Sequence, residues 1–116
     1  LMFQIPDKHT QENIGWCGYH TWYLDHSRAE IGYGLNNDLL KSKGIMSEAL
    51  KAIIDYGFDQ MKLNRIEAFI GPDNIPSLKL VQKFNFKKEG QLRNHYFKNG
   101  KLEDSVVFGL LKEERL

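Results

Sequence analysis

The clearest pattern in this chain is an apolar stripe with helical spacing near its middle. Apolar side chains and one glycine recur there at steps of three and four residues: Met46, Ala49, Leu50, Ile53, Ile54, Gly57, Phe58 and Met61. This spacing places them on one face of an α-helix of about four turns, which Asn64 is expected to end.

A second, shorter helix is predicted after a turn at residues 71–73. Asn74 is a suitable N-cap because its side chain can accept hydrogen bonds from first-turn amides, and Pro76 is tolerated in that turn. The apolar residues of this helix are Leu78, Val81 and Phe84. Asn85 is placed to end it in the left-handed conformation.

Six segments around these helices have strand-like patterns. They cover residues 2–6, 14–24, 28–35, 65–70, 86–97 and 102–111. Asn99 and Gly100 form a strong signal for a tight hairpin between the last two. The first three strands are expected to be antiparallel, whereas the helix after residue 35 is long enough to connect parallel neighbours. The order β-β-β-α-β-α-β-β predicts an α/β fold of mixed α+β type, with a mostly antiparallel sheet and helices packed on it.

Length and composition predict one globular domain over residues 1–116. No apolar run is long enough to span a membrane, and the first residues lack the layout of a signal peptide. A single cysteine, Cys17, excludes an internal disulfide and suits a reducing compartment. We therefore expect a cytoplasmic protein without a membrane partner.

The formal net charge is only +1, but it is unevenly distributed. Acidic residues dominate residues 1–40, and basic residues dominate residues 79–101. This suits a phosphate-rich ligand at one end and a cationic acceptor at the other, although a solvated basic face is the simpler explanation of the charge alone. No nucleic-acid-reading motif accompanies the basic residues, so nucleic acid is not predicted as a partner. The four histidines show no metal-ligand spacing, and no metal is predicted.

The segment from Lys41 to Leu50 holds the strongest functional signal. The strand at residues 28–35 leads through a short polar loop directly into the first helix. Amides at a helix N-terminus lack intrahelical partners, and aligned peptide dipoles place partial positive charge there. Gly44 would let a phosphate approach these donors closely. An ordinary strand-to-helix turn has the same pattern, so the loop alone leaves both interpretations open.

Several sequence blocks occur together in the order found in a known enzyme superfamily. They are Ala-Glu-Ile-Gly-Tyr-Gly-Leu at residues 29–35, Gly-Ile-Met-Ser-Glu-Ala-Leu at 44–50, Leu-Asn-Arg-Ile-Glu-Ala at 63–68, Asn-Ile-Pro-Ser at 74–77 and Phe-Asn-Phe-Lys-Lys-Glu-Gly at 84–90. With the order of elements, these blocks resemble the GCN5-related N-acetyltransferase (GNAT) superfamily, most closely its ribosomal-protein N-terminal acetyltransferase branch. The resemblance covers almost the whole chain. It implies the GNAT fold, acetyl-CoA as acetyl donor and a primary amine as acceptor.

The chain departs from the usual family pattern at four places. The phosphate loop reads Lys41-x-x-Gly44-x-Met46, where glutamine or arginine and a second small residue are usual, and we expect the amide cradle to persist. Val81 stands where many relatives carry a tyrosine that protonates the departing thiolate. Asn85 replaces a glycine. The chain also begins within the family's second strand, so a preceding strand and two helices that help to form the acceptor wall are expected to be missing, through truncation or because the chain is a fragment.

Acetyl transfer to an amine requires a neutral amine, a polarised carbonyl and a proton for the sulfur. An α-amine has a pKa of about 8 and is mostly charged at pH 7, so a general base is required. Glu30 is the candidate, because it shares a strand face with Gly32 and Gly34, which would leave room for a ligand along the backbone. A solvated carboxylate or an ion-pair partner of Arg28 is the alternative. Ser77 is the candidate acid, through water, with a backbone-bonding serine as the alternative.

The resemblance also implies which residues contact the cofactor. Its pantetheine arm is expected to run along the third strand, where backbone amides near Leu35 would polarise the carbonyl. The expected contact residues are Gly34, Leu35, Lys41, Ser42, Lys43, Gly44, Ile45, Met46, Ser47, Asn74, Ser77, Lys79 and Lys83. Lys79 and Lys83 lie one helical turn apart, where they would meet nucleotide phosphates or remain solvated.

Three functions remain open from the sequence. The first is acetyl-CoA-dependent transfer to the α-amine of a protein N-terminus, such as that of a ribosomal protein. The second is a small-molecule amine acetyltransferase with a polyamine, aminoglycoside or amino acid acceptor. The third is a domain that binds acyl-CoA without useful turnover, which Val81 and the missing front segment would allow. A homodimer is compatible with each.

Overall fold

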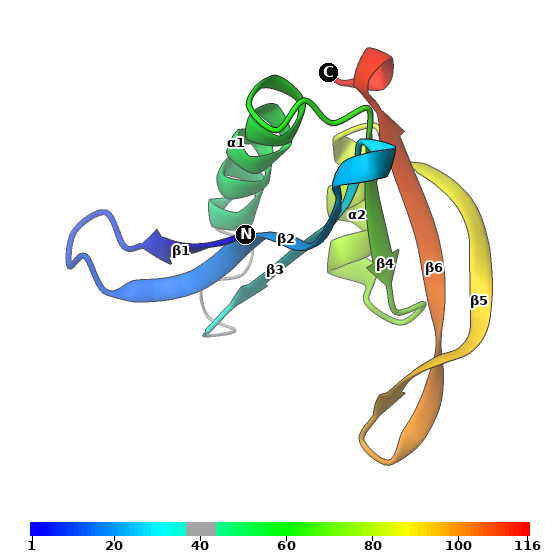
Figure 1. Ribbon diagram of the computed structural model, residues 1–116. Coiled ribbons are helices and arrows are strands. Elements are labelled where there is room, and N and C mark those ends of the chain that lie inside the picture. The colour runs from blue at the N-terminus through cyan, green and yellow to red at the C-terminus, as the bar shows by residue number, and fades with distance from the viewer. Residues whose placement is uncertain (37–43) are drawn as a thin grey trace.

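The computed structural model describes residues 1–36 and 44–116 (Figure 1). In chain order its elements are β1 (Met2–Pro6), β2 (Asn13–Tyr23), a 3₁₀ turn (Leu24–His26), β3 (Arg28–Leu35), α1 (Ile45–Asp59), β4 (Arg65–Ile70), α2 (Ile75–Lys83), β5 (Lys87–Lys98), β6 (Lys101–Leu111) and a second 3₁₀ turn (Lys112–Glu114). This order confirms the one that the hydrophobic pattern predicts. Each strand begins and ends within one residue of its predicted bounds.

The strands form one sheet in the order β1-β2-β3-β4-β6-β5. Neighbouring strands are antiparallel except β3 and β4, which are parallel as the long connection through α1 predicts. This parallel pair is short, because residues 28–30 face residues 65–67 and no further pairing joins the two strands within the described part of the chain. β3 nevertheless continues to Leu35. The two halves of the sheet, β1-β2-β3 and β4-β6-β5, splay apart from this seam in Figure 1.

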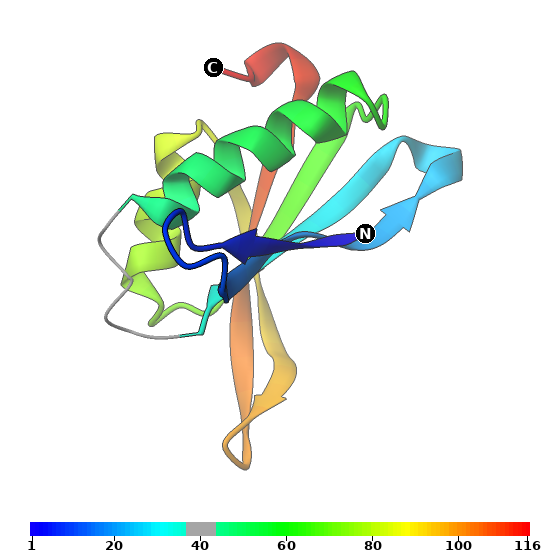
Figure 2. The same cartoon turned by 90° about the vertical axis from the view of Figure 1, so that its left-hand side faces the viewer.

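Both helices lie on the same side of the sheet, as the view in Figure 2 shows. The core beneath them includes Leu50, Phe58 and Val81, which are fully buried. Tyr19 of β2 lies under α1 and donates a hydrogen bond from its hydroxyl to the Ile53 carbonyl at 2.6 Å. Within the described residues, neither helix is long and apolar enough to cross a membrane. The other face of the sheet carries no helix from the described residues and is called the open face below.

The first helix ends earlier than predicted, at Asp59 rather than Asn64. The Tyr56 carbonyl accepts a hydrogen bond from the Met61 amide at 3.1 Å, and Lys62 has a φ of 59°. The chain therefore turns back over the helix end. Met61 stays buried without being helical, which is why its apolar spacing suggested a longer helix.

Candidate functional site

A cleft of about 470 Å³ lies beyond the β3–β4 seam, on the helix side of the sheet. Three segments far apart in the sequence form it: the end of β3, the start of α1 and the start of α2. Its lining residues are Tyr33, Gly34, Leu35, Gly44, Ile45, Met46, Ser47, Asn74, Pro76, Ser77 and Leu80. Every cofactor contact predicted within the described residues lies here except Lys79 and Lys83. The predicted contacts Lys41, Ser42 and Lys43 lie outside the described residues.

The start of α1 presents backbone amides to this cleft. Gly44 is the N-cap, with a φ of 74° and no side-chain cap, and the first helical hydrogen bond runs from the Glu48 amide to the Gly44 carbonyl at 3.1 Å. The first-turn amides therefore have no intrahelical partner and lie at the positive end of the helix dipole. The Lys83 ammonium comes from α2 and donates to Ser47 Oγ at 2.6 Å. The combination suits an anion such as a phosphate.

The start of α2 forms the opposite wall. Asn74 Oδ1 accepts a hydrogen bond from the Ser77 amide at 3.3 Å, which confirms the predicted N-cap. Ser77 is half-buried in the cleft, whereas Lys79 is exposed and does not line it. Asn85 follows the helix with a φ of 71°, in the left-handed conformation predicted for it.

Tyr33 is a lining residue that the sequence did not single out, together with Pro76 and Leu80. Its hydroxyl is buried and has no hydrogen-bond partner of acceptable geometry among the described residues. Burial raises the pKa of the Tyr33 phenol, and the neighbouring Ser77 hydroxyl partly offsets this. Strand alternation would have found Tyr33, because it places this side chain on the same face as Leu35, a predicted contact.

Glu30 lies on the open face and does not line the cleft. The interpretation that Gly32 and Gly34 leave room for a ligand on this face is wrong. A Cβ on Gly32 would collide with the His20 imidazole, and a Cβ on Gly34 would crowd the Trp16 indole. The glycines therefore allow two rings to pack on the strand backbone.

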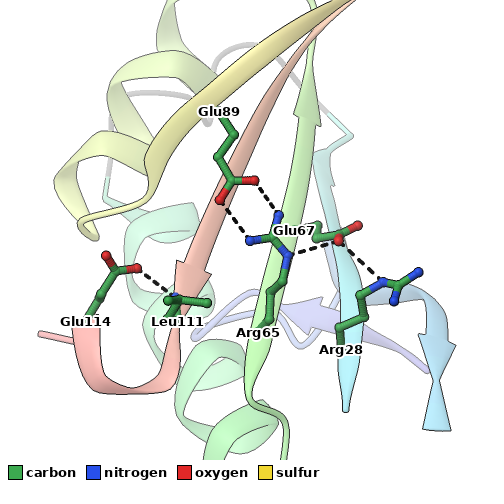
Figure 3. Close-up of polar contacts among 6 residues, drawn as sticks. All are labelled: Arg28, Arg65, Glu67, Glu89, Leu111 and Glu114. Atoms are coloured by element: carbon green, nitrogen blue, oxygen red, sulfur yellow. Dashed lines mark hydrogen bonds and ion pairs between the residues drawn. The ribbon is translucent and has the colours of Figure 1, made fainter. Parts of the chain in front are cut away.

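The carboxylate next to Glu30 is held by arginines. Glu30 and Glu67 face each other across the parallel pair. Glu67 Oε1 lies 3.4 Å from Arg28 Nε and 3.0 Å from Arg65 Nε. Arg65 also donates two hydrogen bonds to the Glu89 carboxylate, at 2.6 and 2.8 Å, so that the network in Figure 3 crosses β3, β4 and β5. Arg28, the alternative partner of Glu30, is thus engaged by Glu67.

Glu30 has no ion-pair partner within residues 1–36 and 44–116. Burial contributes most to raising the pKa of its carboxyl, and the negative charge of Glu67 adds to the increase, while His20 and His95 oppose it. The His95 ring stacks on the Phe69 ring with 5.4 Å between ring centroids, and His95 Nδ1 lies 2.8 Å from Ser105 Oγ. A half-buried carboxylate with a raised pKa accepts a proton more readily than a solvated one.

No group of three His, Cys, Asp or Glu side chains in the described ranges is arranged to hold a metal ion. The region therefore combines a cleft suited to an anion on one side of the sheet with a carboxylate on the other side, Glu30, that has no ion-pair partner in the described part of the chain.

A family model described as an acetyltransferase (GNAT) domain matches residues 1–87. The uncharacterized N-acetyltransferase p20 of Bacillus licheniformis is 46% identical over 112 residues, which are 97% of this chain and 62% of that protein. A spermidine N(1)-acetyltransferase of Escherichia coli (strain K12) is 25% identical over 91 residues, 78% of this chain and 48% of that protein.

Among solved structures, the ribosomal-protein-S5-alanine acetyltransferase of Vibrio fischeri has a TM-score of 0.90 and 28% identity to this chain. The likeness covers 99% of this chain and 63% of that one. The chain therefore spans less than two thirds of the length of these relatives. These matches confirm the fold and the family that the sequence blocks predict.

Proposed function

The chain belongs to the GNAT acetyltransferase family, and we propose that it transfers an acetyl group from acetyl-CoA to a primary amine. The observation that carries this proposal is the cleft in which the end of β3 meets two helix N-termini. Such a site offers amide donors and positive dipole ends to an anionic ligand, and an unpaired strand edge to an extended one.

Acetyl-CoA would bind with its phosphates at the start of α1. The loop residues Lys41, Ser42 and Lys43, the amides from Gly44 to Ser47, and Lys83 are the proposed contacts. The pantetheine arm would follow Gly34 and Leu35, opposite Asn74 and Ser77. Lys79, which is exposed on α2, would contribute charge at longer range only.

Glu30 would act as the general base from the open face. It is the last residue of β3 that pairs with β4, so the opening between the strands begins beside it. The amine would enter from this face, lose a proton to Glu30 and attack the thioester carbonyl. Backbone amides near Leu35 would polarise that carbonyl, and Ser77 would lie on the sulfur side.

For the acceptor, we propose the α-amine of a protein N-terminus, such as that of a ribosomal protein. The likeness to the ribosomal-protein-S5-alanine acetyltransferase of Vibrio fischeri supports this class. An α-amine has a pKa of about 8, so a carboxylate base deprotonates it more easily than an alkyl amine with a pKa of about 10.4. A polyamine is the second candidate, supported by the spermidine N(1)-acetyltransferase relative. Either acceptor would place the reaction in the cytoplasm.

Calorimetry with acetyl-CoA, followed by rate measurements with an amine panel, tests this proposal. Peptides with an N-terminal alanine or serine should be acetylated faster than spermidine. A protein that does not bind acetyl-CoA would contradict the proposal. Binding without turnover on any acceptor would instead favour the non-catalytic acyl-CoA-binding domain that the sequence also allows.

A further inference from the structure

The Tyr33 hydroxyl is a buried donor without a hydrogen-bond partner among residues 1–36 and 44–116. Nearly all buried polar side-chain atoms in folded proteins are hydrogen-bonded, so an exception calls for an explanation. In the described part of this chain, Tyr33 Oη is the buried side-chain atom that has no partner. Tyr19, one strand away, shows the ordinary arrangement, because its hydroxyl donates to the Ile53 carbonyl at 2.6 Å.

The position of Tyr33 indicates where a partner for its hydroxyl would lie, namely in the cleft. Its side chain lines the cleft, and its hydroxyl neighbours that of Ser77 on α2. Glu30 lies three residues earlier on β3 and faces the opposite side of the sheet, since side chains alternate along a strand. A base and a hydroxyl group thus stand on opposite sides of the β3–β4 opening.

We propose that Tyr33 is a catalytic residue that donates the proton to the departing CoA thiolate, and that Ser77 supplies its replacement proton. This inference rests on the proposed function. From the sequence, Ser77 is the predicted donor of this proton, acting through water. Of the two hydroxyls the phenol is the stronger acid, because its ordinary pKa is about 10 and an aliphatic alcohol lies far above that.

The step balances without a further reactant. The ammonium first loses a proton through Glu30 to solvent. The neutral amine nitrogen then forms a bond to the carbonyl carbon and gives a second proton to Glu30. The carbon–sulfur bond breaks with its electron pair on sulfur, which takes the proton of Tyr33 Oη. The phenolate recovers a proton from Ser77, and Ser77 recovers one from water, while Glu30 releases its proton to solvent. Burial raises the pKa of Tyr33, which keeps the phenol protonated before the step.

Tyr33→Phe tests the proposal, with Tyr19→Phe as the matched control. The first variant should lower kcat on the order of 10²-fold, while KM for acetyl-CoA changes by less than about threefold. Its Tm should equal or exceed that of the wild type, because it removes a buried hydroxyl without a partner. Tyr19→Phe should lower Tm, since it removes the buried hydrogen bond from the hydroxyl to the Ile53 carbonyl, and should leave kcat unchanged. Ser77→Ala should lower kcat less than Tyr33→Phe, because water can replace the relay.

Three results would overturn the inference. A Tyr33→Phe protein with wild-type kcat would do so, as would a raised KM with unchanged kcat, which would mark a binding contact. A larger decrease in kcat from Ser77→Ala than from Tyr33→Phe would identify Ser77 as the proton donor to the thiolate. An active wild-type protein with any of these results refutes this inference alone. A wild-type protein that acetylates no amine refutes the proposed function and this inference together.

Discussion

The two faces of β3 offer a reaction different kinds of groups. On the helix side, the donors are first-turn amides and the hydroxyls of Tyr33 and Ser77, held by elements that share one core. On the open face, Glu30, His20 and His95 are strand side chains that are exposed or half-buried. Backbone geometry builds the first site, whereas the second depends on which side chains the strands carry. Donor binding and acceptor chemistry should therefore be separable by substitution.

The largest effect is expected on the open face, from Glu30→Gln. The amide is similar in shape but cannot accept the amine proton, so turnover below the amine's pKa should fall on the order of 10²-fold or more. Acetyl-CoA affinity should be preserved, because Glu30 does not line the cleft. Rates measured between about pH 6 and pH 9 should show partial recovery at high pH, where solvent supplies the neutral amine. A wild-type rate across this range would leave positioning and carbonyl polarisation as the mechanism.

On the helix side, Gly44→Val should weaken acetyl-CoA binding more than about tenfold, which corresponds to about 1.4 kcal/mol. Gly44 has a φ of 74°, which valine strongly disfavours, so the first-turn amides would be displaced. Gly100→Val is the matched control, because Gly100 has a φ of 78° and an added Cβ meets nothing within 4 Å at either glycine. Calorimetry on both variants measures the difference. Equal losses of affinity would show that backbone strain alone explains the result.

A smaller effect is expected from Lys83→Ala. Loss of the ammonium beside Ser47 should weaken acetyl-CoA binding a few-fold at low ionic strength, and the difference should shrink as salt screens the charge. Lys79→Ala should weaken acetyl-CoA binding less, because Lys79 does not line the cleft. Lys98→Ala, at the β5–β6 turn, should leave the affinity unchanged. A loss that does not depend on salt would remove the electrostatic role.

The smallest effects are opposite changes in Tm from two glutamates. Folding raises the pKa of Glu30, so the ionised carboxylate destabilises the folded state at neutral pH, and Glu30→Gln should raise Tm there. Arg65 lowers the pKa of Glu89, so that carboxylate stabilises the fold above its ordinary pKa of 4.5 and loses this contribution as pH falls through the lowered value. Glu89→Gln should lower Tm slightly at neutral pH, because the group is largely exposed.

Thermal unfolding at about pH 7 and again near pH 4 measures both changes. The gain from Glu30→Gln should disappear at the lower pH, where the wild-type carboxyl is protonated. Shifts of the same sign at neutral pH would contradict the difference between the two carboxylates.

The order of elements was predictable because apolar periodicity reports local geometry directly. The end of α1 was not, since burial of Met61 after the helix has the same spacing as a further helical turn. Within the site, the sequence blocks predicted Gly34, Leu35, residues 44–47, Asn74 and Ser77, which line the cleft, but not Tyr33, Pro76 or Leu80. They did not predict that the Tyr33 and Ser77 hydroxyls lie close together, because this contact forms only when α2 packs across from β3.

Two other features of the open face depend on non-local register. The pairing of β2 with β3 shifts between Tyr19 and Thr21, and the intervening His20 packs over Gly32. Glu67 engages Arg28 because the parallel pair brings β4 beside β3. A sequence pattern does not reveal the bulge or the pairing, so it could not show that the space over the glycines is filled or that Glu30 lacks Arg28 as a partner.

The shortness of the β3–β4 seam also bears on how the sheet opens to solvent. The hairpins β2–β3 and β5–β6 pair over much longer stretches than the seam. We expect the two halves of the sheet to behave as separate cooperative units, whose amide hydrogens exchange with deuterium at different rates. The seam joins segments distant in the chain, so its closure should come late in folding. A ligand that contacts β3, α1 and α2 at once would slow exchange in both halves. It would connect them across the β3–β4 seam, where few backbone pairs do so.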